Sequence, residues 1–142
     1  MTLITLPPNY KPTEKEKYMN PQMLEYFRQK LQKWRSELLT ESNDTLESLN
    51  DGGMQEPDIA DRATAETDRA LEFRTRDRER KLISKIDEAL QRIEENEFGY
   101  CDETGEPIGI RRLEARPIAT MTVEAQERHE RMERVQRDEA DE

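Results

Sequence analysis

Two aspartates are the first residues whose type and spacing could do chemistry. Asp58 and Asp61 follow Pro57 at a break between two long charged stretches. Proline supplies no backbone N–H and disfavours helical geometry at the preceding residue, so a chain reversal is predicted here. Paired carboxylates at such a turn could coordinate Mg²⁺ or compete electrostatically with nucleic acid. They could equally cap the second helix. The pair by itself supports no catalytic role.

Other reactive side chains are few. The chain has one cysteine, Cys101, and one histidine, His129. A Ser/His/Asp set and a phosphate-binding loop are missing from the sequence, so no enzymatic activity is predicted. One cysteine excludes an intrachain disulfide, and no apolar run resembles a signal peptide or a membrane span. A cytoplasmic protein without membrane association is therefore expected.

The composition argues against a large compact core. The 142 residues are 32% hydrophobic and 39% charged, with a mean hydropathy of -1.14. An ordinary globular domain is about 45–50% apolar. The apolar residues are nevertheless periodic, which favours long, thin helical packing over disorder. The net charge of -10 argues against direct DNA binding.

A long antiparallel hairpin is predicted over residues 20–97, with its tip at about 54–62. Asn20 and Pro21 suit the N-cap and first position of a helix. A coiled-coil seam at alternating steps of three and four follows. Its residues are Leu24, Phe27, Leu31, Trp34 and Leu38. The returning stripe is predicted to comprise Ala63, Ala70, Phe73, Ile83, Ile86, Leu90 and Ile93. Each helix of about 35 residues would be on the order of 50 Å long.

The stretch Arg74–Lys81 contains no apolar residue and is predicted to be a solvated helix face. Because the hairpin fills its own seam, a monomer is expected.

The two chain ends complete the predicted architecture. Residues 1–19, with three prolines, suggest a flexible or loosely docked arm, and residues 98–121 suggest a small compact module. Residues 122–142 suggest a C-terminal helix with a frayed end. The fold class is therefore mainly α: a coiled-coil hairpin protruding from a small globular part formed by the chain ends. Core candidates of that part are Phe98, Tyr100, Ile108, Ile110, Leu113, Ile118, Met121 and Val123.

Several separated blocks make a family resemblance recognisable. They are Arg74 to Ile83, Phe98 to Cys101, and Ile108 to Pro117. Together with the Pro57–Asp58 tip, these blocks resemble the DksA/TraR family of RNA polymerase-binding transcription factors. The resemblance implies a non-catalytic regulator whose coiled coil enters the secondary channel of bacterial RNA polymerase. With ppGpp it would destabilise open complexes, inhibiting ribosomal RNA promoters and stimulating some biosynthetic ones in the stringent response.

The resemblance also implies roles for individual residues. The family's two acidic tip residues fall on Asp58 and Asp61, and its small tip residue falls on Ala63. A contact to the polymerase rim falls on Arg78.

The family's ppGpp-binding residues are matched incompletely. Two basic residues fall on Lys85 and Arg116. A third position, a lysine in the family, is Gln126 here, so one phosphate contact is missing from the pattern.

The principal departure from the family concerns its zinc site. The positions of the four zinc-binding cysteines are Cys101, Thr104, Thr122 and Ala125 in this chain. Neither a threonine hydroxyl nor an alanine can replace a thiolate on tetrahedral Zn²⁺. A zinc-free, degenerate zinc-finger-like module is therefore predicted, in which packing replaces the folding free energy of metal binding.

A second function class remains open from the sequence. A coiled-coil adaptor with a protein partner other than RNA polymerase would also use a hairpin and a small globular end. The acidic tip distinguishes the two, because an adaptor has no need of Asp58 and Asp61.

Overall fold

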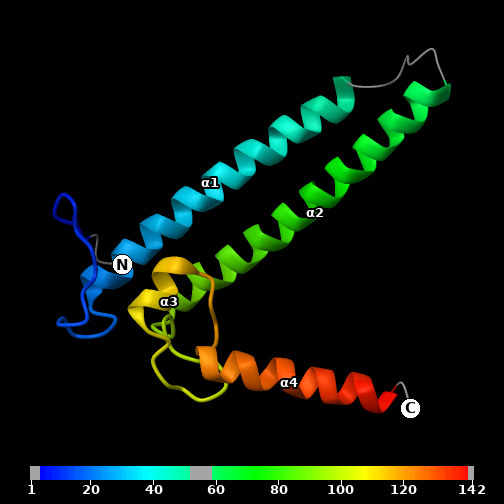
Figure 1. Cartoon of the computed structure of the whole chain (residues 1–142). Coiled ribbons are helices and arrows are strands. Elements are labelled where there is room, and N and C mark those ends of the chain that lie inside the picture. The colour runs from blue at the N-terminus through cyan, green and yellow to red at the C-terminus, as the bar shows by residue number, and fades with distance from the viewer. Residues whose placement is uncertain (1–3, 52–58, 141–142) are drawn as a thin grey trace. The chain divides into compact units, whose positions relative to one another are not determined.

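The computed structural model describes residues 4–51 and 59–140, with the backbone alone for 45–51 and 59–61. Within these ranges the chain forms α1 (Pro21–Asp51), α2 (Ile59–Glu94), α3 (Ile110–Ala115) and α4 (Val123–Ala140), shown in Figure 1. The only other pairing in the described part is an isolated antiparallel bridge between Tyr100 and Pro107. The predicted, mainly helical class is confirmed. Among the described residues, no helix is long and apolar enough to cross a membrane.

The chain divides into two compact units. One unit comprises Leu31–Glu88, and the other combines Met1–Lys30 with Ala89–Glu142. The second unit is thus assembled from both ends of the chain.

The start of α1 follows the predicted capping pattern. The Asn20 side-chain oxygen accepts a hydrogen bond from the Met23 N–H at 2.9 Å. Pro21 occupies the first helical position, where its missing N–H costs nothing. The predicted N-cap is therefore confirmed.

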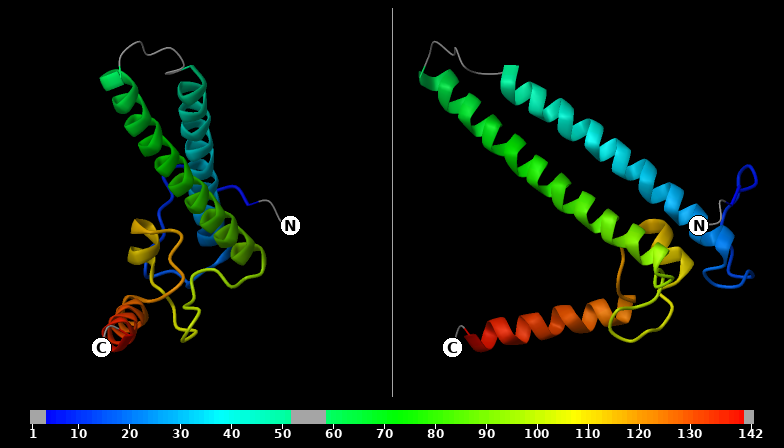
Figure 2. Two further views of the ribbon diagram at one scale, coloured as in Figure 1. Left: turned by 90° about the vertical axis from the view of Figure 1, so that its right-hand side faces the viewer. Right: turned by 180° about the vertical axis from the view of Figure 1, so that it is seen from behind.

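Within the unit Leu31–Glu88, α1 and α2 run side by side in opposite directions (Figures 1 and 2). Leu31, Leu38 and Ile86 are buried, and Trp34 is half-buried. An ion pair joins the Arg35 Nε to the Asp87 carboxylate at 2.7 Å, across 52 residues of sequence. The antiparallel hairpin is confirmed.

The prediction of inward-facing residues in the N-terminal part of α2 is wrong. Phe73 is 53% exposed, and Ala63 and Ala70 are exposed as well. Some of the buried and half-buried positions instead recur in steps of four and three from Ala65 to Ile93. They are Ala65, Arg69, Glu72, Arg76, Glu79, Ile83, Ile86, Leu90 and Ile93. The large apolar residues near the C-terminal end of α2 determine which side of the helix faces α1. Along the rest of the helix, that side carries charged residues.

The end of α2 is determined by an asparagine. Asn96 adopts a positive φ of 61°, the left-handed conformation common just past a helix. The Glu97 N–H donates to the Arg92 carbonyl at 2.8 Å, and the Asn96 N–H donates to the Ile93 carbonyl at 3.2 Å. These two bonds form a Schellman motif. The helix therefore ends at Glu94, three residues before the predicted end of the hairpin at residue 97.

The unit made from the chain ends has its own core. The fully buried Met23 and Phe27 of α1 belong to it, and the Phe27 ring lies 5.5 Å from that of Phe98. Most of the predicted core residues are buried. Those are Phe98, Ile108, Ile110, Leu113 and Ile118. Tyr100 and Met121 are half-buried, whereas Val123 is 45% exposed and was wrongly assigned to the core.

The described part of the N-terminal arm makes contacts that a flexible arm would lack. The Tyr10 ring packs edge-on against Tyr26 of α1 at 6.1 Å. The Tyr18 hydroxyl donates to the Gly99 carbonyl at 2.6 Å and accepts from the Gly109 N–H at 3.0 Å. Two aromatic side chains thus tie residues 4–19 to α1 and to the module.

The last helix begins as predicted. The Thr122 hydroxyl accepts a hydrogen bond from the Ala125 N–H at 3.2 Å, as an N-cap does. Ala125 is fully buried. Met132 and Val135, farther along α4, are 60% and 50% exposed.

Candidate functional site

The two predicted tip carboxylates are only partly within the described structure. Asp58 lies outside the described residues. Asp61 lies in the first turn of α2, which begins at Ile59, and its side chain is not described. Ala63, the predicted small tip residue, lies on the same helix and is exposed.

A basic face runs along α2 and includes two predicted site residues. Arg74, Arg78, Lys81 and Lys85 follow one another at steps of four, three and four, and all four are exposed. This spacing places them on one side of an α-helix. Lys81 pairs with Asp77 at 3.2 Å across exposed side chains, which contributes little stability. The basic face could bind an anion or an acidic protein surface.

The other predicted phosphate-binding residues belong to the unit made from the chain ends. Arg116 is exposed and follows α3, and its N–H donates to the Arg112 carbonyl at 2.7 Å. The Arg112 side chain instead links α3 to the segment before α4, since its Nε donates a hydrogen bond to the Met121 carbonyl at 2.9 Å. Gln126 is half-buried, and its amide donates to Glu130 at 3.1 Å. Lys85 lies in the other unit.

The four positions that correspond to the family's zinc cysteines do not make a zinc site. Cys101 supplies the one thiol, and Ala125 has no donor atom. The Thr122 hydroxyl accepts from the Ala125 N–H, and the Thr104 hydroxyl accepts from the Glu106 N–H at 3.3 Å. No cluster of three or more metal-ligating side chains occurs among the described residues. Tetrahedral zinc needs such a set, so these residues do not fit the metal.

The Cys101 thiol is buried and accepts several hydrogen bonds, two conditions that act on its pKa in opposite directions. Burial by itself would raise its pKa. Hydrogen bonds from the Thr104 hydroxyl and from the N–H groups of Thr122, Thr104 and Glu103 outweigh burial, and the pKa falls from 9.0 to about 7. The side chain is only 4% exposed, which shields the sulfur from reagents in solvent. The thiol therefore acts as a buried hydrogen-bond acceptor between two loops.

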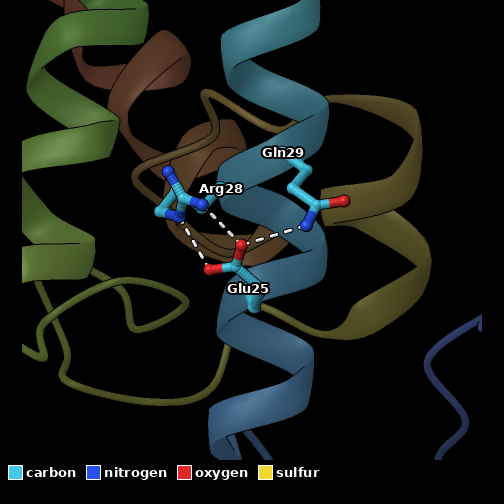
Figure 3. A network of polar contacts seen from close by, with 3 residues as sticks. All are labelled: Glu25, Arg28 and Gln29. Carbon is cyan, nitrogen blue, oxygen red and sulfur yellow. Dashed lines mark hydrogen bonds and ion pairs between the residues drawn. The ribbon is translucent and has the colours of Figure 1, made fainter. Parts of the chain in front are cut away.

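Two clusters of polar side chains lie on the part of α1 that belongs to the same unit as the module. The Lys30 ammonium reaches both the backbone carbonyl and the carboxylate of Glu114, at 2.9 and 2.8 Å. On the neighbouring turn the Glu25 carboxylate accepts from the Arg28 Nε at 2.7 Å and from Gln29 at 3.0 Å (Figure 3). The Arg28 hydrogen bonds lower the pKa of Glu25 below its ordinary value of 4.5. Neither cluster was predicted from the sequence.

The burial of Glu79 contradicts the predicted solvated face of α2. Glu79 belongs to the stretch predicted to be solvated, yet it is only 8% exposed. A continuation of the seam from Ile93 and Ile86 at steps of four and three reaches Glu79. This spacing is the signal in the sequence from which the burial of Glu79 could have been predicted.

Comparison with known proteins assigns the chain to a family. Residues 23–93 match the family model of the N-terminal domain of the DnaK suppressor protein DksA. Residues 96–131 match the prokaryotic dksA/traR C4-type zinc finger. The RNA polymerase-binding transcription factor DksA of Caulobacter vibrioides is 60% identical over 128 residues, which cover 90% of each chain. That of Escherichia coli is 46% identical, over 78% of this chain and 74% of its own.

A solved structure supports the same assignment. Transcription factor DksA2 from Pseudomonas aeruginosa superposes with a TM-score of 0.76 at 44% identity, over 82% of this chain and 90% of that one. The helical hairpin and the module with a single thiol define a coiled-coil protein with a zinc-finger-like end that lacks the four-thiol donor set. The chain belongs to the DksA family of transcription factors.

Proposed function

We propose that this protein binds bacterial RNA polymerase through the secondary channel and regulates transcription initiation without catalysing a reaction, in the cytoplasm. The observation that carries the proposal is 60% identity, over nine-tenths of both chains, to a factor named for polymerase binding. The similarity extends through the hairpin and the module alike.

The hairpin is the part proposed to enter the channel. An antiparallel pair of helices longer than 30 residues each can carry a side chain far from its base, since each residue adds about 1.5 Å. Asp58 and Asp61 would then act at the tip near the catalytic centre, beside Ala63. Their proposed role is to perturb the active centre and destabilise open complexes rather than to deliver a metal ion.

The basic face of α2 is proposed to meet the polymerase and its nucleotide regulator. Arg78 would contact the channel rim. Lys85 and Arg116 would bind ppGpp phosphates, for which cationic side chains are suited. With Gln126 in place of a lysine, one charge-assisted contact is absent. The synergy with ppGpp is therefore expected to be weaker than in a relative that has the lysine.

The module is proposed to work without zinc. Its Cys101, Thr104, Thr122 and Ala125 set does not fit the metal, and buried apolar side chains of the same unit supply packing instead. Regulation is expected to persist under zinc limitation.

Transcription in vitro tests the proposal. A ribosomal RNA promoter would be transcribed by the cognate polymerase, with and without ppGpp and with a chelator throughout. Wild type is expected to inhibit, and Asp58→Asn/Asp61→Asn to lose at least tenfold in inhibitory potency. Asp68→Asn is the matched control, because it makes the same change at an exposed residue farther along α2. Circular dichroism verifies that all variants are folded.

The result that overturns the proposal is equally concrete. If wild type has no effect, or if the double variant inhibits as well as wild type, the tip mechanism fails and an adaptor role takes its place.

Two further variants separate the proposed contacts. Arg78→Ala is expected to weaken inhibition with or without ppGpp, whereas Lys85→Ala should remove the ppGpp effect and retain basal inhibition. Arg80→Ala, at an exposed arginine outside the basic face, is the control for both. Equal effects of the three substitutions would indicate a general loss of positive charge rather than specific contacts.

A further inference from the structure

The seam of the unit Leu31–Glu88 changes its chemistry along its length. On the side nearer Glu88, inward positions are large and apolar, with Leu31, Leu38 and Ile86 buried. On the side nearer Arg62, the half-buried seam positions of α2 are Ala65, Arg69, Glu72 and Arg76. Apolar packing provides most of the stability of a coiled coil, so the described side chains of α2 stabilise the outer half less than the half nearer Glu88.

The large apolar side chains of the outer half of α2 do not compensate for this polarity. Leu71 and Phe73 are 52% and 53% exposed, so they contribute little to the seam. The outer half of α2 therefore turns charged and small residues inward and leaves its large apolar residues outward.

Glu79 lies where the two halves meet. It is the one charged residue among the described side chains that is more than nine-tenths buried. Its Oε2 is also the one buried side-chain oxygen or nitrogen in the described chain without a hydrogen-bond partner. Removing a carboxylate from water without a compensating partner is unfavourable, and a well-packed apolar side chain at such a position is often more stable.

We propose that Glu79 is a built-in weak point that uncouples the outer half of the hairpin from its apolar half. The outer half, α2 residues 62–78 and the facing turns of α1, opens locally while the apolar half stays closed. Elements that change shape on binding are drawn from those of low local stability. The device therefore makes the outer hairpin the adaptable part of the molecule.

Hydrogen exchange of the full chain tests this without polymerase, and so independently of the proposed function. In wild type, amides of residues 62–78 are expected to exchange at least tenfold faster than those of residues 83–88, with a step near Glu79. Glu79→Leu should slow exchange of residues 62–78 at least tenfold and remove the step. Leucine and glutamate have similar helix propensities, so the effect reports on the seam.

The matched control is Glu88→Leu, which makes the same change at an exposed position of the same helix. It should alter exchange of residues 62–78 less than twofold. Glu79→Gln, which keeps the shape and removes the charge, should slow exchange less than Glu79→Leu.

The proposal is overturned if protection in wild type declines gradually toward the end of the hairpin, as simple fraying would produce. It is also overturned if Glu79→Leu leaves exchange of residues 62–78 unchanged or makes it faster. Either result would mean that the buried carboxylate does not uncouple the two halves.

Discussion

The Tyr18 hydroxyl offers the sharpest test of how the arm stabilises the module. It donates to the Gly99 carbonyl at 2.6 Å and accepts from the Gly109 N–H at 3.0 Å. The Gly99 carbonyl also accepts from the Ile108 N–H at 2.8 Å. Tyr18→Phe therefore leaves Gly99 with a partner and the Gly109 N–H without that hydroxyl.

The loss of unfolding free energy in Tyr18→Phe can be worked out from these hydrogen bonds. A net hydrogen bond contributes about 0.5–1.5 kcal/mol, and a part-buried donor left unpaired costs about 1–3 kcal/mol. Tyr18→Phe should therefore destabilise the unit made from the chain ends by about 2 kcal/mol. The ring remains, so its edge-to-face contact with Tyr100 at 5.5 Å is retained and the loss reports on the hydroxyl.

Two assays measure the loss. Urea denaturation followed by circular dichroism gives the change in unfolding free energy, and hydrogen exchange at the Gly109 amide gives the local change, expected to be at least tenfold. Tyr10→Phe is the matched control, because the Tyr10 hydroxyl donates to Glu16 within the arm at 2.9 Å. Its loss should be about 0.5 kcal/mol or less. Equal losses in the two variants, or no change at Gly109, would refute the reasoning.

Three further predictions concern the same unit. Gly99→Ala should be more destabilising than Gly105→Ala in thermal unfolding. Both glycines have positive φ, but only at Gly99 would the new Cβ lie 2.8 Å from the Met19 sulfur. The pairing of Glu25 with Arg28 lowers the folded-state pKa of Glu25, so its contribution is complete above pH 4.5 and is lost as the pH falls through the lower folded-state value. Between pH 6 and 3, wild type should therefore lose more thermal stability than Glu25→Gln, and parallel curves would contradict this. A strong chelator should leave the unfolding midpoint of the purified protein within about 1 °C, since a structural zinc would contribute far more; a fall of many degrees would reveal a bound metal.

Local signals in the sequence were sufficient for the helix starts. The Asn20–Pro21 pair and Thr122 each predicted a helix N-terminus, and the structure has one at both places. Such signals are reliable because an N-cap bonds to an N–H only three residues away. The end of α2 was predicted less well: an asparagine in the left-handed conformation ends the helix at Glu94, three residues before the predicted end of the hairpin at residue 97.

The orientation of the outer hairpin was less predictable. Phe73 and Ala70 were assigned inward because they are apolar, but the phase of a long helix is set where most apolar area is buried. Counting outward from Ile93 would have placed Glu79 and Arg76 in the seam. Residue type and helical phase disagree there, and phase prevailed because a continuous helix cannot rotate one part independently of the next.

Some features of the candidate site could likewise be predicted from the sequence, and others could not. The absence of a four-thiol set followed directly from the sequence, because one cysteine cannot supply it in any fold. The basic face of α2 likewise follows from helical spacing alone. The environment of the Cys101 thiol did not, since its hydrogen bonds come from both residues 103–104 and Thr122.

By itself, then, the sequence determined the helices, the break between them and the family's chemistry, because these depend on residues close together along the chain. The tertiary structure alone decided that the Glu79 Oε2 is buried without a hydrogen-bond partner and that Tyr18 bonds to residues 81 and 91 positions away. Such contacts depend on how distant segments pack, and no local propensity encodes that packing.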